Sequence, residues 1–217
     1  MNRENAKISG PSPWRTQIVV NSERNETIAR LEQAVMVLVL LAFSWPAMMA
    51  VHEMGHVLGA WATGGAVRRV VLHPLVISRT DVRPNPAPLV VVWAGPIVGV
   101  LLPLVLAGMA YCARLGWTYL IGFFAGFCLI ANGAYIGVGV IDGVGDAGVM
   151  LRHGSPPWVL IVFGALCVSA GLWLWHVESR RLGFGHDAQP IDRRHLIGTT
   201  ALTCLLYGLL LAMDLRS

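Results

Sequence analysis

Five long apolar stretches, separated by short polar segments, dominate the pattern of the sequence. A helix needs about 20 mostly apolar residues to cross a bilayer, and each stretch has close to that number. We therefore predict an all-α polytopic membrane protein with about five transmembrane helices. The stretches cover residues 34–62, 88–113, 117–141, 157–177 and 196–213.

Two of the segments between these stretches have a pattern of their own. Residues 64–87 are rich in Val, Ile and Arg and end near a Pro, which is typical of short β-strands rather than of a helix. Residues 142–156 begin with several glycines that break the third helix, and a short helix is expected to start near Asp146. The fold is therefore predicted to carry a short β-like link after its first membrane helix.

The polar start of the chain suggests a simple division into two parts. Residues 1–30 carry mixed charge and no long apolar run, so we expect a polar N-terminal tail. Residues 31–217 would then form one membrane domain. Its core would cover about 34–155, and the last two spans would follow it.

Composition and charge support a membrane protein and argue against a nucleic-acid partner. The chain is 55% hydrophobic and 13% charged, whereas about 25% of residues are charged in an ordinary soluble domain. The net charge is +4, and 15 of the 16 basic residues are Arg, all of them placed outside the apolar stretches. Membrane proteins distribute basic residues in this way, so the charge indicates contact with the bilayer rather than with nucleic acid.

The first apolar stretch contains the strongest chemical signal. His52, Glu53 and His56 form an H-E-x-x-H pattern. Residues four apart lie on one face of a helix, so both imidazoles can reach one metal ion, and Glu53 can deprotonate a water beside it. Ionisable groups at membrane depth are costly and indicate function. The pattern therefore predicts a metal site with Glu53 as the catalytic base.

A catalytic zinc site needs a third protein ligand and one open position. Asp142 and Asp146 both lie in the glycine-rich break after the third span, where the backbone can turn a carboxylate inward. Their spacing from the histidines does not choose between them.

These motifs together resemble the M50 metallopeptidases, the site-2-protease type of intramembrane zinc protease. The resemblance spans about residues 45–155 and rests on VHEMGHVLGAWATGG, the β-like link, AGP in the next span and DAGVMLR. It implies Zn²⁺ held by His52, His56 and a third Asp, and a substrate that is a membrane-spanning or membrane-proximal segment of another protein. Such a segment would have to unwind, and the β-like link could receive it by strand addition.

The resemblance also assigns roles to residues outside the H-E-x-x-H pattern. Asp146 heads DAGVMLR and is the favoured third ligand, with Asp142 as the alternative. Asn132 matches the family's Asn, which implies that it polarises the scissile carbonyl. Its alternative role is a hydrogen bond between helices.

Two other functions remain open beside intramembrane proteolysis. The first is a non-proteolytic M50-like binding or regulatory protein, because the segment after Asn132 lacks the Pro of the family motif. The second is a small metal transporter, which would need ionisable groups along several spans. The second, fourth and fifth spans offer almost none.

Two arguments about orientation in the membrane disagree. If the N-terminus is inside, ten Arg and Lys residues lie inside and six outside, which the positive-inside rule favours. The family resemblance implies the reverse, with residues 64–87 near the cytoplasmic face. In either orientation we expect an integral, multi-pass protein of a bacterial cell membrane. The oligomeric state is not predicted.

Overall fold

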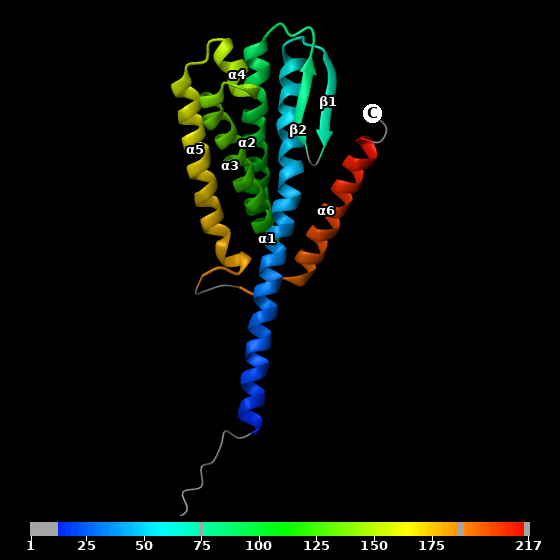
Figure 1. The fold of residues 1–217 in the computed structure, drawn as a ribbon, viewed down its shortest axis with the longest axis vertical. Coiled ribbons are helices and arrows are strands. Elements are labelled where there is room, and N and C mark those ends of the chain that lie inside the picture. The colour runs from blue at the N-terminus through cyan, green and yellow to red at the C-terminus, as the bar shows by residue number, and fades with distance from the viewer. Residues whose placement is uncertain (1–12, 74–75, 186–188, 215–217) are drawn as a thin grey trace, which may run out of the picture.

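The computed structural model describes residues 13–73, 76–185 and 189–214. It confirms an all-α polytopic architecture, because five of its helices are long and apolar enough to cross a membrane (Figure 1). The chain is therefore an integral, multi-pass membrane protein. The five helices are α1 (Pro13–Ala62), α2 (Pro88–Cys112), α3 (Thr118–Asp142), α5 (Pro157–Glu178) and α6 (Arg193–Asp214).

Helix α1 begins within the segment for which we predicted a polar tail. It runs unbroken for 50 residues from Pro13, and residues 1–12 lie outside the described part of the chain. Neither Gly nor Pro occurs between Trp14 and Trp45, so nothing in the local backbone stops the helix as it becomes polar. At 1.5 Å per residue α1 is about 75 Å long, and its N-terminal part projects beyond the other helices (Figure 1).

The link after α1 forms short β-strands, as predicted, and the structure pairs them as a hairpin. Strand β1 (Val67–His73) pairs antiparallel with β2 (Val76–Val82), and Val71 lies opposite Arg79. Gly64 ends α1 in a left-handed conformation with φ of 75°, which glycine adopts without steric cost. The hairpin packs back against α1.

Two short helices complete the fold. Helix α4 (Gly145–Arg152) is the short helix expected near Asp146, and a 3₁₀ turn, η1 (Ser179–Leu182), extends α5. The hairpin, α4 and the C-terminal end of α6 all lie at one end of the bundle, opposite the projecting part of α1 (Figure 1).

Small residues allow the membrane helices to approach closely. A Cβ added at Gly164 of α5 would lie 2.7 Å from the carbonyl oxygen of Gly133 in α3, and one at Gly171 would lie 2.7 Å from that of Gly126. Membrane helices associate through such contacts because lipid provides no hydrophobic drive between them. Helix α6 is different, since only 6% of its most apolar 18-residue segment is buried against the rest of the protein. Its exposed leucines therefore suit contact with lipid.

Candidate metal centre

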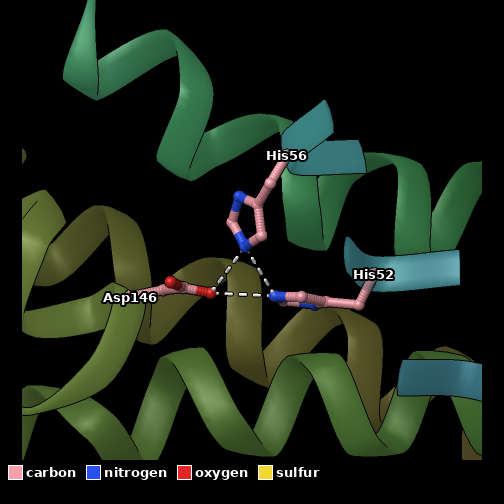
Figure 2. A group of neighbouring side chains, drawn as sticks. All are labelled: His52, His56 and Asp146. Carbon is pink, nitrogen blue, oxygen red and sulfur yellow. Dashed lines mark hydrogen bonds and ion pairs between the residues drawn. The ribbon is translucent and has the colours of Figure 1, made fainter. Parts of the chain in front are cut away.

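Two helices from distant parts of the chain bring three ligand atoms together. His52 and His56 lie one turn apart on α1, and each is 7% exposed. Asp146 is the second residue of α4 and follows Gly143 and Gly145, which have φ of 62° and 58°. These two left-handed residues reverse the chain after α3, so the Asp146 carboxylate faces the imidazoles (Figure 2).

The distances within this group are short enough for a single ion to contact all three residues. Asp146 Oδ2 lies 2.8 Å from His52 Nε2 and 3.2 Å from His56 Nε2, and the two Nε2 atoms are 3.0 Å apart. Within the described residues, His52, His56 and Asp146 form the group of ligand atoms suited to hold a metal. Asp142 is exposed at the end of α3 and is not in the group.

The outer nitrogen of each imidazole has a fixed oxygen acceptor. His52 Nδ1 donates to Asn132 Oδ1 at 2.6 Å, and His56 Nδ1 donates to the carbonyl oxygen of Val91 at 2.8 Å. Asn132 Nδ2 donates to the Cys128 carbonyl at 2.9 Å, and this bond turns the amide oxygen toward His52. With Nδ1 protonated, each neutral ring directs the lone pair of Nε2 into the group.

This arrangement fits a divalent cation. Two neutral imidazole nitrogens and a carboxylate oxygen are all electron-pair donors, so without a positive charge between them they would repel one another. Protons on both Nε2 atoms would also repel at 3.0 Å. Two His and one Asp are typical ligands of a catalytic zinc ion and leave one position open.

Asp146 is held in the ionised form that metal binding requires. Burial alone would raise the pKa of its carboxyl group. Hydrogen bonds from His52 and His56, together with their positive charge when protonated, instead hold this pKa well below its usual range. A bound cation would supply the positive charge beside this carboxylate in place of an imidazole proton.

Glu53 lines the same cavity as His52, His56 and Asp146, but its hydrogen bonds are with the β-hairpin. Its side chain is 3% exposed, and Ser78 and Thr80 of β2 donate hydrogen bonds to its two carboxylate oxygens at 2.7 and 2.6 Å. The sequence analysis did not identify these two hydroxyls. The sequence did indicate that the two hydroxyls lie on one face, because Ser78 and Thr80 are two residues apart in a predicted strand.

Asn132 and Tyr135 of α3 form hydrogen bonds to the candidate metal ligands His52 and Asp146. Asn132 is 1% exposed, and both ends of its amide make hydrogen bonds within the protein. The bond to His52 is a hydrogen bond between helices, and contact of Asn132 with a scissile carbonyl stays a prediction. Tyr135, which the sequence analysis missed, accepts a hydrogen bond from the Asp146 backbone N–H at 3.1 Å. Its ring packs edge-on against His52.

A single cavity contains the whole arrangement. Its volume is about 680 Å³, within the range of ligand-binding pockets. The polar groups described above share it with apolar side chains of α1. The cavity is lined by residues of α1, β2, α2, α3 and α4, including Trp45, Met48, Met49, His52, Glu53, His56, Val91, Asn132, Tyr135 and Asp146.

Residues 33–139 match the Peptidase M50B-like family. The match covers just under half of the chain, which is similar to that family over these residues. The match confirms the resemblance noted in the sequence. It includes the H-E-x-x-H motif and Asn132, but it ends before Asp142 and Asp146, so the geometry alone selects Asp146 as the partner of the histidines. No curated protein and no solved structure matches this M50-like chain.

Proposed function

We propose that this M50-like protein is an intramembrane zinc metalloprotease that hydrolyses peptide bonds in or near membrane-spanning segments of other proteins. One observation carries the proposal. The Nε2 atoms of His52 and His56 and a carboxylate oxygen of Asp146 converge in a cavity that also contains the Glu53 carboxylate. This is the set of groups that metal-assisted hydrolysis requires.

His52, His56 and Asp146 would hold the zinc ion. Zinc, when bound, supplies a Lewis acid that polarises the scissile carbonyl and lowers the pKa of a coordinated water. Asn132 and the Val91 carbonyl hold the two imidazoles in the required tautomer and orientation through their Nδ1 atoms. Asn132 therefore contributes by orienting His52.

Glu53 carries the proton through the reaction. Its carboxylate takes a proton from water as the water oxygen bonds to the peptide carbonyl carbon. It then gives that proton to the amide nitrogen as the C–N bond breaks, so one carboxylic acid and one amine are formed from one water.

The edge of β2 supports an extended peptide as the substrate. Consecutive residues 77–83 line the cavity. Alternate side chains of a strand point to opposite faces. Residues from both faces of β2 line the cavity, so the edge of β2 faces the cavity. The sheet has the order β1-β2, so one edge of β2 is not paired with β1. A locally unwound membrane segment would add there as a third strand and bring its carbonyls to Glu53.

Substitution of the base tests the proposal. Glu53→Gln preserves the size of the side chain and removes its basicity. We expect this variant, purified in detergent, to retain about one zinc per chain and to lose cleavage of a panel of reconstituted single-span substrates. Asp142→Asn is the matched carboxylate-to-amide control and should keep both properties.

Other results would favour the alternatives. Zinc binding without cleavage by the unmodified protein, over the whole substrate panel, would support an M50-like binding or regulatory protein. Cleavage by Glu53→Gln at the unmodified rate would exclude Glu53 as the base. Zinc transport into vesicles would support the transporter. Among the described residues, however, the three candidate metal ligands lie in one cavity and do not extend across the membrane.

A further inference from the structure

The Glu53 carboxylate is held by side chains from outside its own helix. Glu53 is buried within an apolar helix, where an ionised carboxylate is stable only with hydrogen-bond donors around it. Ser78 Oγ donates to Oε1 at 2.7 Å, and Thr80 Oγ1 donates to Oε2 at 2.6 Å. These distances are typical of hydrogen bonds from a hydroxyl to a charged oxygen.

The alternation of β2 explains how one strand provides both donors. Ser78 and Thr80 are two residues apart, so they share the face of β2 that meets α1. Arg79 and Asp81, on the other face, form an exposed ion pair at 3.7 Å. A shift of one residue in the pairing of β2 with β1 would turn both hydroxyls to the opposite face, away from Glu53.

We propose that Ser78 and Thr80 are positioning residues that hold the two oxygens of Glu53 in the geometry for proton transfer. This role rests on the proposed proteolytic function. Each carboxylate oxygen has two lone-pair sites, and the hydroxyl occupies one of them. The second remains free to accept the proton of the attacking water.

The proposal predicts an effect on the chemical step rather than on substrate binding. A Glu side chain on a helix has three rotatable bonds, and without the hydroxyls its carboxylate can rotate away from the reacting water. The edge of β2 would receive substrate through backbone atoms, which these substitutions leave in place. Loss of the hydroxyls should therefore lower kcat and leave KM nearly unchanged.

Hydroxyl deletion tests this role. We expect Ser78→Ala and Thr80→Val to lower kcat about tenfold each and about a hundredfold together, with KM and zinc content as in the unmodified protein. Ser78→Thr and Thr80→Ser keep the hydroxyl groups, so each should have a kcat close to that of the unmodified protein.

Matched controls remove hydroxyls that serve only their own helix. Ser179 donates to the His176 carbonyl, and Thr203 donates to the Thr199 carbonyl. Ser179→Ala and Thr203→Val should therefore leave kcat unchanged.

A second measurement does not depend on activity. Removing both hydroxyls leaves the buried carboxylate without its donors, so the double variant should unfold at a lower temperature in detergent. In a Glu53→Ala background the same double substitution should lower the unfolding temperature much less, because no carboxylate is left unpaired.

The outcomes separate this inference from the proposed function. An active protein whose double variant keeps its kcat, or loses rate only through KM or zinc content, overturns the inference alone. Equal losses of unfolding temperature in both backgrounds also overturn it. An unmodified protein that cleaves no substrate overturns the proposed function and, with it, this role in proton transfer.

Discussion

His52 and His56 have the same place in the motif but different outer partners. His52 donates to a side-chain amide on α3, whereas His56 donates to a backbone carbonyl of α2. The backbone carbonyl cannot be removed by substitution, so the orientation of His56 depends on the position of α2. The orientation of His52 depends on the side chain of Asn132, which a substitution can remove.

Asn132→Ala should therefore weaken metal binding without removing a ligand. We expect zinc affinity to fall about 10–100-fold, the usual effect of losing the partner of a metal-bound histidine. Competition with a chelator on the purified protein measures it. Asn25→Ala, at an exposed position in α1, is the control. An unchanged affinity in Asn132→Ala would mean that the contact with His52 does not orient the ligand.

The two candidate aspartates should differ sharply when each is replaced. Asp146→Asn removes a ligand charge beside both imidazoles, and we expect zinc affinity to fall by more than about a hundredfold. Asp142→Asn changes an exposed residue and should leave zinc content unchanged. The opposite result would make Asp142 the ligand, and the turn at Gly143 and Gly145 would then have to differ from the one described here.

At the scale of elements, the contact between α3 and α5 depends on glycine. A Cβ at Gly164 would meet the Gly133 carbonyl at 2.7 Å and the Cα atom of Gly137 at 2.8 Å. Both are backbone atoms, so neither can rotate away. Helix α3 carries Asn132 and leads into α4, and for this reason its packing also supports the metal centre.

Gly164→Ala should destabilise the bundle even though alanine is the better helix former. We expect a loss of about 1–3 kcal/mol, as is typical of overpacking, seen as a lower unfolding temperature in detergent. Gly108 of α2 has no neighbour within 4 Å of an added Cβ. Gly108→Ala should thus be neutral or stabilising, and equal effects at the two positions would contradict close packing of α3 on α5.

At the scale of the whole molecule, five spans place the two ends of the bundle on opposite sides of the membrane. The polar part of α1 projects from one end, and the hairpin and α4 lie at the other (Figure 1). Single cysteines at Glu26 and Asp142 should therefore react with a membrane-impermeant reagent from opposite sides. The experiment needs a background without the native cysteines, Cys112, Cys128, Cys167 and Cys204.

The same experiment compares the two arguments about orientation. Reaction of the Glu26 site from the cytoplasmic side would agree with the distribution of Arg and Lys. Reaction from outside would agree with the family resemblance, which implies a hairpin near the cytoplasmic face. Reaction of both sites from one side would contradict five spans.

The membrane helices and the short β-strands could be predicted from the sequence because both depend on local patterns. About 20 apolar residues in a row specify a span whatever its neighbours are, and the predicted spans agree closely with α2, α3, α5 and α6. The N-terminal limit of α1 was not predicted. A polar composition indicates exposure to water, but it does not end a helix that lacks Gly and Pro.

The sequence by itself also determined that His52, Glu53 and His56 share one region of α1, because helical periodicity places residues four apart on one face. Only the tertiary structure placed Asp146, and not Asp142, beside the histidines, brought Asn132 to His52, and placed Ser78 and Thr80 on Glu53. These partners are 25 to 94 residues apart in the chain. Contacts over such separations depend on how whole helices pack and where the glycines turn the backbone, and local patterns do not contain that information.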